Sequence, residues 1–121
     1  MVTLELPWPP SVNHYYRHVG PRVLISKVGR TYREVVANRI KAEGISKFSG
    51  NVELNIQLYP PDNRRRDIDN VLKCLLDTLT IGGLYEDDSQ IKSLEIKKLE
   101  PIPPAGLAVL KAKKYEKDQL S

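Results

Sequence analysis

The residues best suited to do chemistry are concentrated in one segment, RRRDIDNVLK, which spans positions 64–73. Three arginines precede Asp67 and Asp69, and Lys73 follows one helical turn after the second aspartate. Residues i and i+2 do not share a helix face, so the two carboxylates converge only if a helix begins at or just after Asp67. In that arrangement a negatively charged site adjoins groups that attract phosphate.

The same segment also has an ordinary structural interpretation. Aspartate is favoured at the N-cap and in the first turn of a helix, where the helix dipole favours negative charge. Asp69 and Lys73 have the i, i+4 spacing of a simple surface ion pair, and the arginines can neutralise the neighbouring carboxylates. Taken alone, the segment does not decide between a functional site and a capped helix.

A second acidic group, Glu86, Asp87 and Asp88, follows the second predicted helix. A helix of about 14 residues is roughly 20 Å long, so this group begins at the far end from Asp67. The acids meet only if the strand that starts near residue 90 runs back along the helix. The alternative interpretation is a solvated turn that happens to be acidic.

The charge distribution points to a polyanionic partner. The 121-residue chain has a net charge of +4, and residues 1–66 carry 11 Lys and Arg against 5 Asp and Glu. Residues 67–100 reverse this balance, with 4 against 8. A basic chain with an acidic island can bind a polyanion and hold cations in one molecule, although an unevenly charged, solvated surface gives the same composition.

Composition predicts a single globular domain over residues 1–121. The chain is 40% hydrophobic and 28% charged, which is ordinary for a soluble protein with one core. We expect no membrane span and no secretory signal, because the apolar stretches are short and MVTLELPWPP lacks both a basic and an apolar signal region. The single cysteine, Cys74, predicts a reducing cytoplasm and a small core residue.

Alternating apolar and polar residues predict the strands. The clearest case is Asn51–Tyr59, in which every second residue is Val, Leu or Ile, so that one face is apolar. Shorter patterns predict three further strands: Val2–Leu6, residues 90–99 and Leu107–Ala112. The polar and aromatic segment Ser11–Val19 is expected to be a loop, followed by a short strand at Val23–Ile25.

Apolar residues at helical spacing predict two helices. The first spans about residues 27–43, with Ser26 as its N-cap and Gly44 just beyond its end. The second begins near Ile68 and carries a leucine-rich stripe that ends at Gly82-Gly83. The order β-α-β-α-β-β predicts a compact α+β domain with a mixed sheet packed against two helices.

Three motifs together resemble RusA-type Holliday junction resolvases: LPWPPSVNHYYR, RRRDIDNVLK and EDDSQ, in this order. The pattern of that family is a Pro-Trp-Pro opening, an Arg-rich D-x-D-N-x-x-K segment, and then D-D-x-Q. The resemblance spans about residues 4–98. One position departs from the pattern, because Asn63 stands where the first of four basic residues is usual.

The resemblance implies a magnesium-dependent homodimeric endodeoxyribonuclease that resolves four-way DNA junctions by paired nicks, in recombination and repair. The metal-binding, catalytic aspartates of the family fall on Asp67, Asp69 and Asp88, and its essential lysine on Lys73. Hard carboxylate oxygens suit Mg²⁺, which lowers the pKa of water and neutralises phosphate. Lys73 would stabilise developing charge. The sequence offers no covalent nucleophile with a paired base.

Four arginines are expected to contact DNA phosphates: Arg17, Arg64, Arg65 and Arg66. Tyr15 and Tyr16 could stack on unpaired bases at the crossover, while one of them is expected to pack against the sheet. A two-fold dimer would match the symmetry of a four-way junction. Two alternatives remain open: a non-catalytic nucleic-acid-binding module, and a nuclease of the same chemistry that acts on other branched DNA.

Overall fold

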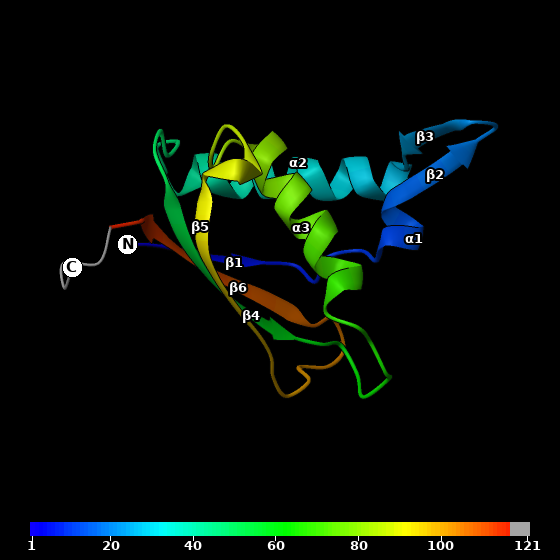
Figure 1. The fold of residues 1–121 in the computed structure, drawn as a ribbon. Coiled ribbons are helices and arrows are strands. Elements are labelled where there is room, and N and C mark those ends of the chain that lie inside the picture. Colours follow the sequence, from blue (N-terminus) through cyan, green and yellow to red (C-terminus); the bar gives the residue numbers. More distant parts are fainter. Residues whose placement is uncertain (117–121) are drawn as a thin grey trace.

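A four-stranded sheet with the order β1-β6-β4-β5 forms the framework of the computed structural model, which describes residues 1–116 (Figure 1). Its strands are β1 (Val2–Leu6), β4 (Val52–Tyr59), β5 (Ile91–Lys98) and β6 (Leu107–Lys114). β4 pairs with β5 in parallel, whereas β6 is antiparallel to both β1 and β4. The sheet is therefore mixed, as the sequence predicts.

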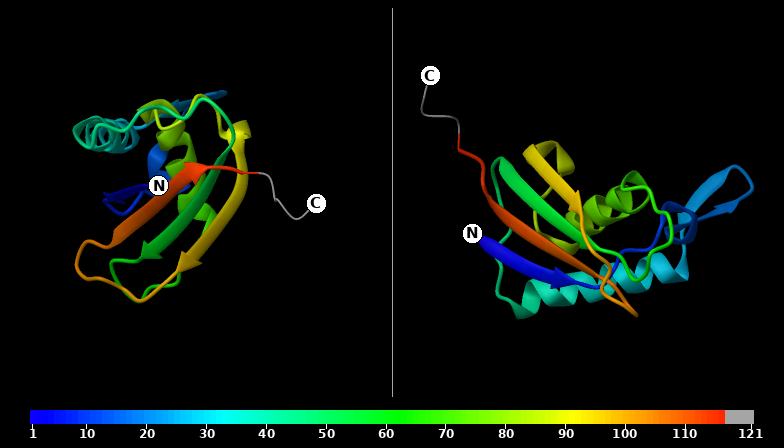
Figure 2. Two further views of the ribbon diagram at one scale, coloured as in Figure 1. Left: turned by 90° about the vertical axis from the view of Figure 1, so that its left-hand side faces the viewer. Right: turned by 90° about the horizontal axis from the view of Figure 1, so that it is seen from below.

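Two helices, α2 (Lys27–Ala42) and α3 (Asp69–Gly82), cover one face of the sheet (Figure 2). The alternation in β4 explains this packing, because its apolar residues are all buried under the helices, whereas the residues between them are only partly covered. The core also takes in Val36 of α2 and Leu75 of α3, both fully buried. The α+β class with one core is confirmed.

The helix ends lie where the sequence predicts them. The Ser26 hydroxyl accepts a hydrogen bond from the backbone N–H of Gly29 at 3.0 Å and so caps α2. Gly44, just beyond that helix, has a φ of +67°, and Gly83 after α3 has a φ of +92°. Glycine adopts this left-handed conformation without steric cost, which is why these residues end the two helices.

The prediction of a loop at Ser11–Val19 is wrong. The chain forms a one-turn helix, α1 (Val12–Tyr15), and then a hairpin of β2 (Tyr16–Val19) and β3 (Arg22–Ile25), which forms a sheet of its own. The hairpin projects from the body of the molecule (Figure 1), so neither of its faces is fully buried and its sequence lacks the alternation of a half-buried strand. The predicted order β-α-β-α-β-β therefore omits α1, β2 and β3, although a short strand at Val23–Ile25 was expected.

Tyr15 is fully buried, but it joins helices instead of packing on the sheet. Its hydroxyl accepts hydrogen bonds from Arg33 Nε of α2 at 2.6 Å and from Thr78 Oγ1 of α3 at 3.1 Å. The expectation that one tyrosine packs against the sheet is thus replaced by a contact between the three helices. Tyr15 anchors the hairpin, because β2 begins at the next residue.

The contact of α2 with α1 leaves no room for a side chain at Gly29. An added Cβ would lie 2.6 Å from the backbone oxygen of Tyr15 and 2.9 Å from Ile25 Cγ2. We expect Gly29→Ala to lower the free energy of unfolding by about 1–3 kcal/mol, the usual cost of overpacking. Urea denaturation measures this, and Gly50→Ala is the control because an added Cβ there has open space. Equal stability of the two variants would contradict the packing described here.

Two composition-based expectations can be compared with the structure. Cys74 is buried on α3, and burial raises the pKa of its thiol to about 11, in agreement with a structural core residue. Within residues 1–116, no helix has the length and apolar character that a membrane crossing requires.

Candidate functional site

The two aspartates of the central motif flank the start of α3. Asp67 lies in the irregular segment before the helix, Ile68 is the N-cap residue, and Asp69 is the first helical residue. The Asp67 carbonyl accepts a hydrogen bond from the Asn70 N–H at 3.2 Å. The chain therefore turns into the helix between the two carboxylates, as their convergence requires.

Neither carboxylate is used to cap the helix. Both residues are exposed, and among residues 1–116 neither side chain makes a hydrogen bond or an ion pair. Exposed carboxylates without a hydrogen bond or ion pair are available to a ligand, although Asp69 in the first turn also interacts favourably with the helix dipole. This favours the functional interpretation of the motif over the capped helix.

The arginines before this site bind a different carboxylate, Asp62. Arg64 Nη2 lies 3.1 Å and Arg66 Nη1 lies 2.6 Å from its oxygens. These two guanidinium groups hold the pKa of Asp62 well below its usual range. The sequence-based alternative, in which the arginines neutralise neighbouring carboxylates, thus holds for Arg64 and Arg66, but at Asp62 and not at Asp67 or Asp69. Arg65 is exposed and forms no ion pair with any described residue.

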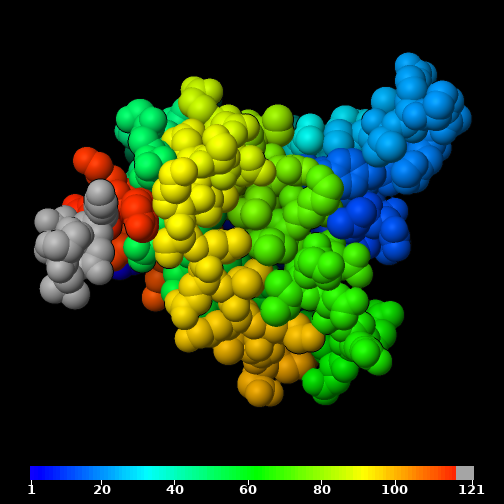
Figure 3. Space-filling model, viewed as in Figure 1, coloured from blue at the N-terminus to red at the C-terminus, as the bar shows by residue number. Residues whose placement is uncertain are grey.

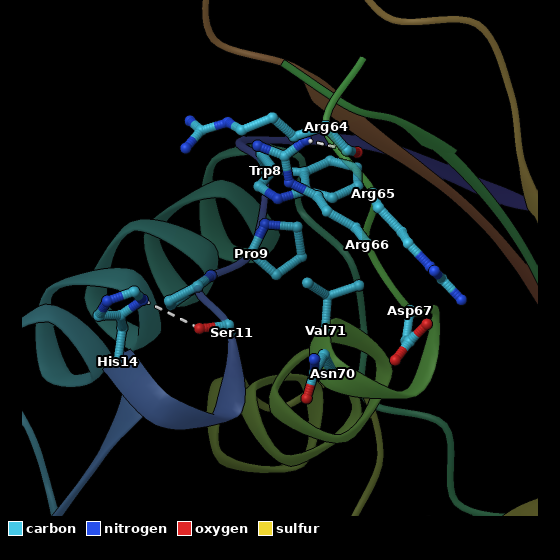
Figure 4. A pocket seen from close by; sticks show the side chains of 11 residues that line it. Trp8, Pro9, Ser11, His14, Arg64, Arg65, Arg66, Asp67, Asn70 and Val71 are labelled. Atoms are coloured by element: carbon cyan, nitrogen blue, oxygen red, sulfur yellow. Dashed lines mark hydrogen bonds between the residues drawn. The ribbon is translucent and has the colours of Figure 1, made fainter. Parts of the chain in front are cut away.

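A pocket of about 570 Å³ joins the first motif to the second (Figure 4). Trp8 and Pro9 line it from the N-terminal segment, and the arginine run with Asp67 lines it from the loop before α3. Trp8 is partly buried and also packs against the core. The pocket therefore combines an apolar wall with guanidinium groups beside Asp67, a composition that suits a sugar–phosphate backbone.

Lys73 pairs with Asp77, one helical turn further along, and not with Asp69. Its Nζ lies 3.1 Å from Asp77 Oδ2 and 3.3 Å from the Tyr16 hydroxyl, which itself donates to Asp77. Burial and the Asp77 carboxylate raise the pKa of Tyr16 to about 12, whereas hydrogen bonds to Asp77 and Tyr16 raise the pKa of Lys73. Both groups stay protonated at neutral pH. The sequence analysis missed Asp77, although its i, i+4 spacing from Lys73 is a signal that could have identified it.

Asp88 lies at the other end of α3, in the 3-10 helix η1 (Asp88–Gln90). Gln90 fixes this turn, since its Nε2 donates to the backbone oxygens of Phe48 and Gly50 at 3.0 and 2.7 Å. Asp87 caps the turn by accepting from the Ser89 N–H at 2.9 Å. The Asp88 side chain is exposed and, within the part of the chain that the structure describes, makes no hydrogen bond or ion pair.

The three candidate metal ligands do not meet within one chain. β5 starts beside the start of β4, where Ile91 pairs with Val52, so Asp88 lies at that end of the two strands. α3 begins near the opposite end of the strands (Figure 1). Over residues 1–116, no cluster of three or more His, Cys, Asp or Glu side chains could hold a metal ion. One chain brings Asp67 and Asp69 to the same helix end but leaves Asp88 at the opposite end.

The fourth predicted DNA contact, Arg17, is exposed on β2. The hairpin that carries it also borders a second pocket of about 290 Å³, lined by Tyr16, His18 and Val23 together with Lys73 of α3. The hairpin thus extends the basic surface beyond the arginine run. Lys73 of α3 lies at this second pocket, beside the hairpin.

Comparison with known proteins identifies the family. Residues 7–109 match the model of the family described as Endodeoxyribonuclease RusA. The chain is 40% identical over 104 residues to a crossover junction endodeoxyribonuclease of Enterobacteria phage 82, with 85% of this chain and 86% of that protein covered. It is 39% identical over 105 residues to the corresponding protein of Escherichia coli K12, with 86% and 87% covered.

The matched residues include the Pro-Trp-Pro opening, the arginine run and all four candidate catalytic residues. The match defines the class of protein: the chain is an endodeoxyribonuclease, a hydrolase that cuts within a DNA strand. Within this class, it belongs to the RusA family.

Proposed function

We propose that this chain, a Holliday junction resolvase by family, cuts four-way DNA junctions in the cytoplasm as a Mg²⁺-dependent homodimer and so acts in recombination and repair. The observation that carries this proposal is the position of Asp67 and Asp69. Both carboxylates are exposed and free of hydrogen bonds or ion pairs with the described residues, and Asp67 borders the arginine-lined pocket. Such a site offers metal ligands where a DNA phosphate would bind.

The donor set suits Mg²⁺ if two copies of the chain contribute to one site. Mg²⁺ takes hard oxygen ligands, keeps several waters and needs only a few carboxylates. Asp67 and Asp69 of one copy would supply two of them. Asp88 of the same copy lies at the far end of α3, a helix of 14 residues that is roughly 20 Å long. The third carboxylate would therefore come from the second copy.

A two-fold dimer along α3 would complete each site. If the two α3 helices run antiparallel across the axis, the η1 turn of one copy lies beside the start of α3 in the other. The surface available for this contact is the α3–β5 side (Figure 3), where β5 is an edge strand. Ile81 and Leu94 are 60% and 40% exposed there, which provides apolar area to bury.

The residues of this site divide the work of phosphodiester hydrolysis. The chemistry that a bound Mg²⁺ supplies is neutralisation of phosphate charge and a lower pKa for the attacking water. Arg65 and its neighbours bind the flanking phosphates and orient the strand. Lys73 remains protonated and donates a hydrogen bond to the phosphate oxygen on which negative charge develops. Two such sites related by a two-fold axis match the symmetry of the junction and produce paired nicks.

Cleavage of a synthetic four-way junction, a flap and a linear duplex of the same sequence tests this function. We expect the junction to be cut at symmetric positions in Mg²⁺, and not in EDTA, with little cleavage of the other two. Equal cleavage of the flap would instead indicate a nuclease for branched DNA in general. Binding without cleavage at any Mg²⁺ concentration would indicate a non-catalytic module.

The salt dependence of binding tests the phosphate contacts. Each phosphate contact contributes about 0.9 to the slope of log affinity against log salt on duplex DNA. Arg64 and Arg65 are exposed at the pocket, so replacing both with Gln should flatten the slope by roughly one to two units. Gel shifts at several salt concentrations measure this. Lys111→Gln with Lys113→Gln, on the sheet face opposite the helices, is the control and should keep the slope.

A further inference from the structure

The side chain of Lys73 is held by two groups from different parts of the fold. Asp77 comes from the next turn of α3, whereas Tyr16 comes from the start of the β2–β3 hairpin. The Lys73 ammonium lies 3.1 Å from the Asp77 carboxylate, 3.3 Å from the Tyr16 hydroxyl and 5.1 Å from the centre of the Tyr16 ring. A flexible lysine side chain is thereby restricted by an ion pair, a hydrogen bond and a cation–π contact.

The Lys73 ammonium has one more hydrogen-bond donor than its two partners, Asp77 and Tyr16, use. The single hydroxyl proton of Tyr16 is donated to Asp77, so the Tyr16 oxygen accepts from Lys73. An ammonium group has three donors, and two of them are used by Asp77 and Tyr16. The third has no partner among residues 1–116, and Lys73 lines the open pocket of about 290 Å³ beside the hairpin.

Tyr16 is itself braced by the buried part of the molecule. Its ring meets that of Tyr15 edge to face, with the centroids 4.7 Å apart. Tyr15 is fully buried and receives hydrogen bonds from both α2 and α3. The position of the Lys73 ammonium therefore depends on the junction of three helices and not only on its own rotamer.

We propose that Asp77 and Tyr16 are positioning residues for cleavage: they hold the Lys73 ammonium so that its free donor meets the phosphate of the bound junction. This inference rests on the role proposed above for Lys73. Asp77 is 32% exposed and Tyr16 is half-buried, so the cluster is open to solvent at the pocket that Tyr16 and Lys73 line. A catalytic side chain that the folded protein already holds in place does not lose conformational freedom during the reaction. Such preorganisation raises the cleavage rate without tightening the binding of uncut DNA.

Single-turnover cleavage of a four-way junction by Asp77→Asn, Tyr16→Phe and Lys73→Ala tests this assignment. We expect Asp77→Asn and Tyr16→Phe each to slow the cleavage step about tenfold, since small misplacements of catalytic groups are costly. Junction affinity in gel shifts should stay the same, or tighten slightly for Asp77→Asn because a negative charge is lost. Glu53→Gln is the matched control, since it also breaks an exposed ion pair, with Lys113 at 3.7 Å on the open face of the sheet.

A double-mutant cycle separates positioning from structural damage. In a Lys73→Ala background, Asp77→Asn should cause no further loss of rate, because the group it positions is already absent. Additive losses, or an Asp77→Asn enzyme as fast as or faster than wild type, would overturn the inference while leaving the role of Lys73 intact. A Lys73→Ala enzyme with wild-type rate would instead overturn the proposed role of Lys73. If Asp77→Asn lowers the melting temperature, the cycle is run with Tyr16→Phe, which keeps the ring.

Discussion

Asp67→Asn, Asp69→Asn and Asp88→Asn should each reduce Mg²⁺-dependent junction cleavage by at least about a hundredfold and leave junction binding intact or tighter. Each variant loses one proposed metal ligand, and ligand loss removes the charge neutralisation on which hydrolysis depends. Each also removes a negative charge that faces the DNA backbone, which favours binding. Nicking assays and gel shifts in Mg²⁺ measure the two effects on the same preparation.

The control for this series is Glu86→Gln. Glu86 lies two residues before Asp88 and forms an ion pair with Lys47 at 3.0 Å. It is therefore another acid of the same turn, but one already engaged in a structural contact, and its replacement should leave cleavage unchanged. Wild-type turnover in all three aspartate variants would contradict the metal assignment.

Mixing two inactive variants should restore cleavage if the dimer shares its sites as proposed. In a mixed dimer of Asp67→Asn and Asp88→Asn chains, one site receives both substitutions and the other receives neither. Subunit exchange between equal amounts gives about half mixed dimers, so roughly a quarter of all sites should be intact. Junctions nicked on one strand should accumulate, because each mixed dimer has one working site.

The same mixture gives the opposite result if each site belongs to a single chain. Every site would then carry one substitution, and no cleavage would return. The control mixes Asp67→Asn with Asp69→Asn, which lie at the same end of α3. Both sites of that mixed dimer lack a ligand under either arrangement, so this mixture should stay inactive.

Local patterns were sufficient to predict most of the framework. The alternation in β4 and the glycines after α2 and α3 gave element ends that agree with the structure to within a residue or two. The hairpin at Tyr16–Ile25 was only half predicted, since it is braced by Tyr15 and not by an apolar face of its own. Such support is long-range and leaves no periodic signal in the sequence.

The candidate site shows a similar division. The free carboxylates at the start of α3 follow from the spacing of Asp67 and Asp69, but the partners of the basic residues do not. Arg64 and Arg66 bind Asp62, and Lys73 binds Asp77, because side-chain geometry selects among several acids within reach in the sequence. Asp88 lies at the far end of α3 and precedes β5, so the parallel pairing of β5 with β4 does not bring it back to Asp67.

The pairing of the first strand with the last has a consequence for synthesis of the protein. Among the described residues, β6 is the only sheet neighbour of the edge strand β1, with Val2 opposite Ala112. Trp8 follows β1 directly and forms the apolar wall of the arginine-lined pocket. In a nascent chain, β1 cannot pair within the sheet until β6 has emerged from the ribosome, although the arginine run emerges earlier. The segment that carries Trp8 is therefore anchored on both sides only after nearly the whole chain has been translated, and a truncated product would carry Asp67 and Asp69 beside a pocket wall that lacks the support of the sheet.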